Sequence, residues 1–405
     1  MPRQIEVFLN RTKFSADPVT SVADFSFAQL SKALRFHRSV PGYAPTPLVT
    51  LPRLARVLGV GSVYVKDESA RFGLKAFKVL GGAYSMARHI ANLVGRDIDD
   101  LPFTELAGER VRKAIGDVVF ATTTDGNHGR GVAWTARQLG QKAVVYMPKG
   151  STAKRLEAIR SEGARAEIVP MNYDDAVRMT AEVAERHGWL VVQDTAWPGY
   201  ESIPLWIMQG YGTLMLEAVQ QLHEVPPTHI FIQAGVGSLA GMVQGMVTAA
   251  WGKDRPRVIV AEAAAADCLY RSATAATGAA IAVSGDLETV MAGLACGEAN
   301  GIGWQILRDY ADAFATCPDF VTARGMRVLG TPLPGDPAVI SGESGAVTIG
   351  LLSILMQSER LESVREALGL DGESRVLLVS TEGDTDPQRY RSIVWDGRLP
   401  SYQQF

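Results

Sequence analysis

A carboxylate stands inside a glycine-bounded turn in the first third of the chain. The run Thr122-Thr123-Thr124-Asp125-Gly126-Asn127-His128-Gly129 follows a short apolar stretch at 117–121 and precedes apolar residues at helical spacing. This pattern predicts a strand, a turn and a helix, with Asp125 at the carboxyl end of the strand, where ligands bind in open α/β sheets. An Asp in a turn also commonly acts only as a cap, so the turn alone leaves both interpretations open.

A lysine stands beside two glycines at the start of another predicted helix. Lys78 follows Phe77, which begins the apolar stripe of that helix, and Gly81 and Gly82 come three and four residues after the lysine. Residues at these spacings share a helix face, and each glycine costs about 1 kcal/mol of helix propensity. We therefore predict a face bare of side chains next to the amine, on which a flat group could rest. The alternative is an ordinary solvated lysine.

A glycine run follows the predicted strand at 230–233 and opens a helix. It contains Gly235, Val236, Gly237, Ser238 and Leu239. Backbone N–H groups at a helix N-terminus form a cradle for anions, so the run predicts a phosphate site. The spacing also fits the dinucleotide pattern G-x-G-x-x-A, with Glu262 at the end of the next strand in the place of a ribose-binding acid. The motif thus indicates a phosphate more surely than it indicates which ligand carries it.

Three further segments are expected to be loops at strand ends, namely 193–197, 341–346 and 380–386. Each could be a simple cap or turn. Asp194 leads into a loop with Trp197 and Tyr200, and aromatic neighbours could desolvate its carboxylate and tune it as a base.

Composition narrows the class of partner. The chain has 405 residues, 47% of them apolar, which is enough for a large core and favours two domains. Lys and Arg number 40 and Asp and Glu 43, so we expect no basic surface that would bind nucleic acid or membranes. The expected partner is a small molecule. Residues 1–7 do not resemble a secretory signal, which predicts a cytoplasmic protein.

Two other classes of site are not expected. The uncharged stretch 230–252 is long enough to cross a bilayer, but its glycines favour a strand, a loop and a helix. The cysteines Cys268, Cys296 and Cys317 have no CxxC spacing and no paired His nearby, so no metal site is predicted. Buried thiols are the simple interpretation, although Cys268 and Cys296 could lie close together.

Strand-like and helical segments alternate along most of the chain, which predicts an α/β protein of two doubly wound domains with largely parallel sheets. The cleft between the domains is the expected site. Predicted strands cover 143–147, 166–169, 190–192, 230–233, 258–262 and 376–380, and predicted helices cover 153–161, 174–186, 204–222, 239–250 and 346–356.

Taken together, these motifs resemble, in the same order, those of the fold-type II pyridoxal-phosphate enzymes, the tryptophan synthase β family. The resemblance rests on 76–82, the Asp125 turn, 235–241 and 380–384, and it runs from about residue 36 to 395. Common members have Ser or Thr before Gly-Asn-His-Gly. Asp125 in that place, together with 193–197, makes the chain similar to the 2,3-diaminopropionate ammonia-lyases within the family. Segments 41–43, 64–69, 291–298 and 341–346 agree.

The resemblance implies a large cofactor-binding domain of residues 1–88 and 200–405 and a small domain of residues 89–199. It also implies roles. Lys78 would hold pyridoxal 5'-phosphate covalently, Asn127 would bind its ring oxygen, and Ser380, with Thr381 beside it, would bind its ring nitrogen. Further cofactor contacts would come from Phe77, Gly235, Val236, Gly237, Ser238 and Leu239, and substrate contacts from Thr124, Asp125, Gly126, His128 and Asp194.

The implied reaction is the α,β-elimination of D- and L-2,3-diaminopropionate to pyruvate and two molecules of ammonia, by a homodimer. Lys78 would act as base on the L isomer and Asp125 on the D isomer, while Asp125 and Asp194 set the chain apart from serine and threonine dehydratases. Such a dehydratase is the first alternative. A nicotinamide-dependent oxidoreductase built on the glycine run and a silent ligand-binding protein are the others.

Overall fold

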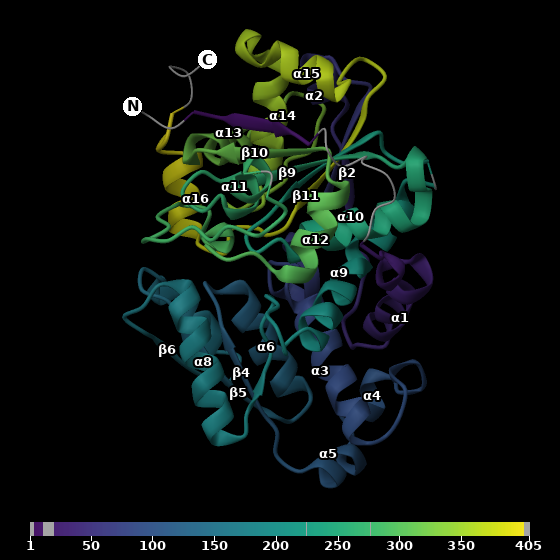
Figure 1. Cartoon of the computed structure of the whole chain (residues 1–405), viewed down its shortest axis with the longest axis vertical. Coiled ribbons are helices and arrows are strands. Elements are labelled where there is room, and N and C mark those ends of the chain that lie inside the picture. The colour runs from purple at the N-terminus through teal and green to yellow at the C-terminus, as the bar shows by residue number, and fades with distance from the viewer. Residues whose placement is uncertain (1–3, 11–19, 224, 276, 401–405) are drawn as a thin grey trace.

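The computed structural model describes residues 4–10, 20–223, 225–275 and 277–400, so the first three residues of the N-terminal segment considered above lie outside it. The chain forms two sheets flanked by helices, the larger in the upper half of Figure 1 and the smaller in the lower half. This confirms the α/β class and the largely parallel sheets.

The larger sheet has seven strands in the order β1-β10-β9-β8-β11-β3-β2. Its inner pairs are parallel, and only the edge strands β1 and β2 pair antiparallel. Central strands of parallel sheets are buried on both faces, and all five residues of β8 are buried. The strands are β1 (Glu6–Leu9), β2 (Leu48–Thr50), β3 (Ser62–Asp67), β8 (His229–Gln233), β9 (Arg257–Ala263), β10 (Ala313–Cys317) and β11 (Arg375–Ser380).

The smaller sheet has four parallel strands in the order β6-β5-β4-β7. They are β4 (Val119–Thr123), β5 (Lys142–Met147), β6 (Arg165–Ile168) and β7 (Leu190–Val191). The strand expected at 117–121 begins two residues later, at Val119. All four strands lie within the predicted small domain, whereas its proposed first residue, 89, falls inside the helix Val79–Leu93. The domain boundaries stay a prediction.

The predicted helices are present with small shifts at their ends. The helices are α1 (Phe27–Arg38), α2 (Pro52–Leu58), α3 (Val79–Leu93), α4 (Phe103–Leu106), α5 (Glu109–Ile115), α6 (Asn127–Gln138), α7 (Ala153–Arg160), α8 (Tyr173–His187), α9 (Ser202–Gln221), α10 (Ser238–Trp251), α11 (Cys268–Thr274), α12 (Gly301–Tyr310), α13 (Asp319–Gly330), α14 (Val347–Gln357), α15 (Glu362–Leu368) and α16 (Pro387–Val394). The stretch 230–252 becomes β8 and α10, and no helix in the described ranges is long and apolar enough to cross a membrane.

Helices α9 and α6 cover the face with the two glycines after Lys78, which corrects the expectation of a bare face, and Gly81 is the glycine that this packing requires. A Cβ on Gly81 would lie 2.5 Å from Cε1 of Tyr211 and 2.6 Å from Cγ2 of Ile207, both on α9. A Cβ on Gly82 would lie 3.5 Å from Cγ2 of Val132 on α6. Because α9 fills the space beside Gly81, the glycine permits close approach of two helices and leaves no platform for a ligand.

A buried ion network joins β3 to α9 just before Lys78 in the chain. Glu217 Oε2 lies 2.7 Å from Lys66 Nζ and 2.8 Å from Arg71 Nη2, and the same Arg71 nitrogen lies 2.8 Å from Glu68 Oε1. Burial alone would raise the pKa of Glu217, but Arg71 and Lys66 lower it to about 2. The network therefore holds the segment that leads to Lys78 against the helix that packs on it.

Glu262 has a structural role at the end of β9. Its carboxylate oxygens accept the backbone N–H groups of Leu269, at 2.9 Å, and Tyr270, at 2.6 Å, at the start of α11. Burial raises its pKa to about 8. The carboxylate is thus occupied as a helix cap, which argues against the ribose-binding role that a dinucleotide site would need.

Candidate active site

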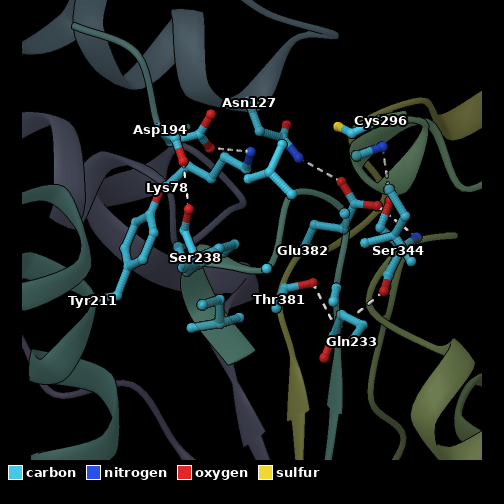
Figure 2. Close-up of a pocket in the computed structure, with 18 residues that line it drawn as sticks. Lys78, Asn127, Asp194, Tyr211, Gln233, Ser238, Cys296, Ser344, Thr381 and Glu382 are labelled. Atoms are coloured by element: carbon cyan, nitrogen blue, oxygen red, sulfur yellow. Dashed lines mark hydrogen bonds and ion pairs between the residues drawn. The ribbon is translucent and has the colours of Figure 1, made fainter. Parts of the chain in front are cut away.

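A cavity lies where the carboxyl ends of strands from both sheets meet, and Figure 2 shows the side chains around it. Ligands of open α/β folds bind at this edge. The cavity is lined by Phe77, Lys78, Asn127, Asp194, Tyr211, Gln233, Ala234, Gly235, Val236, Gly237, Ser238, Leu239, Gly293, Leu294, Cys296, Ser344, Thr381 and Glu382.

Lys78 and Asp194 form a buried ion pair on the cavity wall. Lys78 Nζ lies 2.6 Å from Asp194 Oδ2, and the side chains are 16% and 3% exposed. Burial disfavours both charges, but the attraction between them prevails: it lowers the pKa of Asp194 to about 2 and raises that of Lys78 above its usual value. In this structure the amine is therefore a cation held by one carboxylate.

The surroundings of Asp194 correct part of the expectation. Trp197 and Tyr200 stack on each other with ring centroids 4.2 Å apart, and the Tyr200 hydroxyl bonds to the backbone of β7 and Gln193. Tyr173, from another segment, reaches the carboxylate, and its hydroxyl lies 3.4 Å from Oδ1. Asp194 is buried as expected, but pairing with Lys78 lowers its pKa where desolvation alone would raise it.

The glycine run closes one end of the cavity and has the geometry of an anion cradle. It joins β8 to α10, with Gly237 at a positive φ of 92° immediately before the helix. A Cβ on Gly235 would stand 3.1 Å from the carbonyl oxygen of Gly293 and 3.2 Å from Cys296 Sγ, so a side chain there would be tightly packed. The helix N-terminus thus meets the cavity at bare backbone, which suits a phosphate group.

Ser238 links the cradle to the ion pair. Its hydroxyl donates to the backbone carbonyl of Asp194 and accepts the amide of Asn300 at 2.8 Å. The loop that carries Asp194 is therefore fixed to the start of α10. Since the cradle and the Lys78 amine border the same cavity, the donor set fits a ligand that has both a phosphate and an aldehyde, as pyridoxal phosphate does.

On the remaining wall, the predicted residues Asn127 and Thr381 bond to polar side chains that the sequence patterns did not single out. Gln233 Nε2 donates to Thr381 Oγ1 at 2.9 Å, and Asn127 Nδ2 donates to Glu382 Oε2. Glu382 Oε1 accepts the backbone N–H of Ser344 at 2.8 Å. Glu382 and Ser344 lie in loops that had been expected at strand ends. Tyr211 and Gln233 lie within a helix and a strand, where periodicity indicates only burial.

Most predicted cofactor residues line the cavity, but five predicted site residues do not, namely Ser380, Thr124, Asp125, Gly126 and His128. The Ser380 hydroxyl donates to Ser341 Oγ at 2.8 Å, and Thr124 Oγ1 accepts the backbone N–H of Gly126 at 2.9 Å. The buried ring of His128 bonds through Nε2 to the carbonyl oxygen of Val192 at 2.7 Å, and burial lowers its pKa. Ser380, Thr124, Gly126 and His128 therefore shape the loops behind the cavity wall.

Asp125 borders an adjoining hollow. The guanidinium of Arg155 lies beside it in that hollow, with Nη1 3.1 Å from Asp125 Oδ2. Asp125 also lies near the cavity, because its Oδ2 is 3.7 Å from the place of a Cβ on Gly293, which lines the cavity. The cysteines are free and buried, and the described residues contain no cluster of three or more His, Cys, Asp or Glu that could hold a metal.

Comparison with known proteins agrees with this geometry. Residues 40–380 match the family model described as pyridoxal-phosphate dependent enzyme. The diaminopropionate ammonia-lyase of Escherichia coli K12 is 52% identical over 377 residues, which cover 92% of this chain and 93% of the relative. The diaminopropionate ammonia-lyase of Salmonella typhimurium is 51% identical over 371 residues, or 91% and 92% of the two chains.

A solved structure of the Escherichia coli enzyme, in complex with an aminoacrylate-PLP azomethine reaction intermediate, superposes with a TM-score of 0.90. It is 49% identical, and the match covers 98% of both chains. By its family match, its relatives and its fold, this chain belongs to the pyridoxal-phosphate dependent enzymes of fold type II, in the diaminopropionate ammonia-lyase family.

Proposed function

We propose that this chain eliminates ammonia from 2,3-diaminopropionate with pyridoxal 5'-phosphate as cofactor. The amino acid and one water would yield pyruvate and two molecules of ammonia. The observation that carries the proposal is the ion pair of Lys78 and Asp194, 2.6 Å apart, in a cavity bordered by the glycine cradle. Relatives that are about half identical over nearly the whole chain are diaminopropionate ammonia-lyases, which supports this substrate.

The residues of the cavity divide the work of holding the cofactor. Lys78 Nζ would bind it covalently, the backbone of 235–239 would bind its phosphate, and Asn127 would bind its ring oxygen. Thr381 is the better candidate for the ring nitrogen because the Ser380 hydroxyl is engaged with Ser341. Pyridoxal phosphate, when bound, withdraws electrons from Cα of an attached amino acid and so makes the Cα proton removable.

Two carboxylates suit a substrate that carries a second ammonium group on Cβ. Asp194 is buried and ionised, and would balance the positive charge of Lys78 while the lysine is protonated. Asp125 would attract the β-ammonium group or remove the Cα proton. We assign proton removal to Lys78 Nζ for the L isomer and to the Asp125 carboxylate for the D isomer, since Lys78 stands at the start of α3 and Asp125 follows β4.

The oligomeric state and the cellular location of the protein are also proposals. We propose a homodimer, as is usual in the family, and a cytoplasmic location. Sedimentation velocity of the purified protein measures the first, and fractionation of the source cells the second.

Product analysis tests the proposed reaction. Purified protein loaded with pyridoxal phosphate is incubated with D- and L-2,3-diaminopropionate, serine and threonine, and pyruvate or 2-oxobutyrate is measured together with ammonia. We expect one pyruvate and two ammonia per diaminopropionate, with much slower turnover of the hydroxy amino acids. Faster turnover of serine or threonine would instead identify a dehydratase.

A further inference from the structure

Tyr211 is a buried tyrosine on the cavity wall to which no role has been given. It lies in the middle of α9, lines the cavity together with Lys78 and Asp194, and is 1% exposed. Its ring packs on that of Phe77, the residue before Lys78, with ring centroids 4.6 Å apart. The absence of a side chain at Gly81 makes room for the ring, since a Cβ there would lie 2.5 Å from Tyr211 Cε1. The close packing of α3 on α9 thus admits this tyrosine to the site.

The hydroxyl of Tyr211 is buried and has no hydrogen-bond partner among the described residues. Figure 2 shows the ring directed toward the pair formed by Lys78 and Asp194. Burial and the charge of Asp194 raise the pKa of Tyr211 well above its usual value, while Lys78 lowers it, so the hydroxyl keeps its proton and is a donor. It stands within reach of the carboxylate, without the geometry of a hydrogen bond. A buried unpaired hydroxyl is costly, and phenylalanine would fill the same space without that cost.

Asp194 needs a donor that remains when its ion pair is broken. The buried carboxylate is balanced by Lys78 Nζ at 2.6 Å. The same nitrogen is the atom that the proposed function attaches to the cofactor, so the free ammonium group is absent for part of each cycle. Burial alone raises the pKa of a carboxyl group, so an Asp194 left without a donor would tend to take up a proton.

The other groups that face Asp194 are poor substitutes for Lys78. The hydroxyl of Tyr173 already lies 3.4 Å from Oδ1 while the ion pair is intact. His128 donates from Nε2 to a backbone carbonyl, and burial lowers its pKa, so the ring is neutral and Nδ1 has no hydrogen to donate. The thiol of Cys296 is a weak donor, and Asp125 is an acceptor.

We propose that the Tyr211 hydroxyl replaces Lys78 as hydrogen-bond donor to Asp194 while the lysine is bonded to the cofactor, which makes Tyr211 a positioning residue. This inference rests on the proposed function. The phenolic O–H donates to a carboxylate oxygen and keeps its proton, so no proton is transferred in the exchange. Asp194 stays ionised, and the pair forms again when Lys78 is released and protonated.

A comparison without cofactor tests this exchange of partners. Lys78→Ala removes the ammonium group permanently and so reproduces the interval in which it is engaged. Tyr211→Phe is introduced into the wild type and into Lys78→Ala, and calorimetry at pH 7 gives the melting temperatures of the cofactor-free proteins. In the wild type the hydroxyl has no bond to lose, so we expect an unchanged or higher value. In Lys78→Ala we expect a loss of about 2 to 4 °C, as for one hydrogen bond to a charged group in a chain of this length.

The matched control is Tyr84→Phe. Tyr84 is a buried tyrosine of α3 whose ring packs near that of Phe36, with centroids 5.9 Å apart, and it does not line the cavity. Tyr84→Phe should change the melting temperature equally in both backgrounds. Circular dichroism confirms that each variant is folded, and Lys78→Met, which is closer in size to lysine, serves where Lys78→Ala is not.

The pH profile of the loaded enzyme gives a second measurement that a merely structural role would not move. A hydrogen bond to the charged form lowers the pKa of a carboxyl group, so its loss in Tyr211→Phe should raise the pKa of Asp194. We expect the acid limb of kcat/KM for L-2,3-diaminopropionate to move upward by about one to two pH units. Tyr84→Phe should leave the limb in place.

Equal effects of Tyr211→Phe in the two backgrounds, or an acid limb that does not move, would overturn the proposal. Failure of the proposed function is recognised separately, because the wild type would then make no pyruvate from diaminopropionate. The melting temperatures require neither cofactor nor turnover and would still report on Tyr211.

Discussion

At the scale of single residues, the chemistry of the site depends on which of its groups are protonated. Asp194 is ionised because Lys78 lies 2.6 Å away, and Lys78 is held as a cation in return. Asp125 stands apart from this pair and is held by Arg155. The two proposed bases, Lys78 and Asp125, therefore approach the site from different elements, which gives a physical basis for acting on both isomers of a substrate.

Asp125→Asn should separate the isomers. The amide keeps the size of the side chain but cannot act as a base, and general-base help is worth about 10²- to 10⁴-fold in rate. We expect kcat/KM for D-2,3-diaminopropionate to fall by that factor and kcat/KM for the L isomer to change little. Steady-state assays of pyruvate release on each isomer measure both values.

A surface carboxylate provides the control for this substitution. Asp117→Asn changes a side chain that is 71% exposed and paired with Lys142, so both isomers should be turned over normally. If Asp125→Asn slows both isomers equally, the assignment of one base to each isomer is wrong.

The residues that sequence could place are those with a local signature. Lys78, Asp125, Asn127 and the run 235–239 each lie at a junction between elements, where turn chemistry and glycine spacing are visible in a single segment. Tyr211 and Gln233 reach the cavity from the middle of α9 and the end of β8, and periodicity shows only that they are buried. Their role depends on which distant element they face.

At the scale of secondary-structure elements, the close packing of α3 against α9 and α6 sets the position of Lys78. The sequence interpretation misassigned Gly81 because the side chains that fill the space beside it, from Ile207 and Tyr211, come from a helix more than a hundred residues away. A helix glycine that permits close packing and one that clears room for a ligand look the same in sequence.

The two glycines of α3 should respond oppositely to alanine. Gly81→Ala would place a methyl group 2.9 Å from the backbone oxygen of Ile207, and overpacking of this kind costs about 1–3 kcal/mol. In Gly82→Ala the nearest atom is at an ordinary 3.5 Å, so the gain in helix propensity should stabilise by up to about 1 kcal/mol. Urea unfolding of the two variants measures both changes, and similar destabilisation by both would contradict the packing account.

The ion network between β3 and α9 predicts a large loss of folding stability in Glu217→Gln. Removing this charge leaves Lys66 and Arg71 buried with one carboxylate fewer, and breaking a buried pair costs about 3–5 kcal/mol. The matched control is Glu109→Gln, since Glu109 is 69% exposed and pairs with Lys113 on the surface, where such pairs contribute less than about 1 kcal/mol. Denaturant unfolding at pH 7 compares the two.

The pH dependence of this loss has a definite sign. The pKa of Glu217 is about 2 in the folded chain, below the value near 4.3 that an unfolded glutamate has. Its stabilising contribution is therefore complete above about pH 4.3 and disappears as the pH falls through about 2. The difference in unfolding free energy between wild type and Glu217→Gln should narrow over that window, and a gap that stays constant would argue against the ion network as its source.

At the scale of the whole molecule, the cavity draws its walls from both sheets. Asn127 follows β4 of the smaller sheet, whereas the cradle at 235–239 and Thr381 follow β8 and β11 of the larger one. A cofactor that contacts all three should therefore stabilise the arrangement of the two sheets as well as supply the chemistry.

Removal of pyridoxal phosphate should lower the melting temperature by several degrees. A ligand present at 100 times its dissociation constant stabilises the folded state by about 2.7 kcal/mol. Calorimetric scans of the protein before removal with hydroxylamine, after removal and after reloading should show the loss and its recovery. Reloading with pyridoxal, which lacks the phosphate, serves as control and should restore less; equal recovery would contradict the assignment of the cradle to phosphate.

The most direct test of the account is the covalent attachment of the cofactor at Lys78. The loaded protein is reduced with borohydride, digested and analysed by mass spectrometry, and Lys78→Ala is assayed for pyruvate release. We predict a phosphopyridoxyl group on the peptide that contains Lys78, and no pyruvate from the variant. A reduced cofactor on another lysine, or undiminished pyruvate release by Lys78→Ala, would contradict the account.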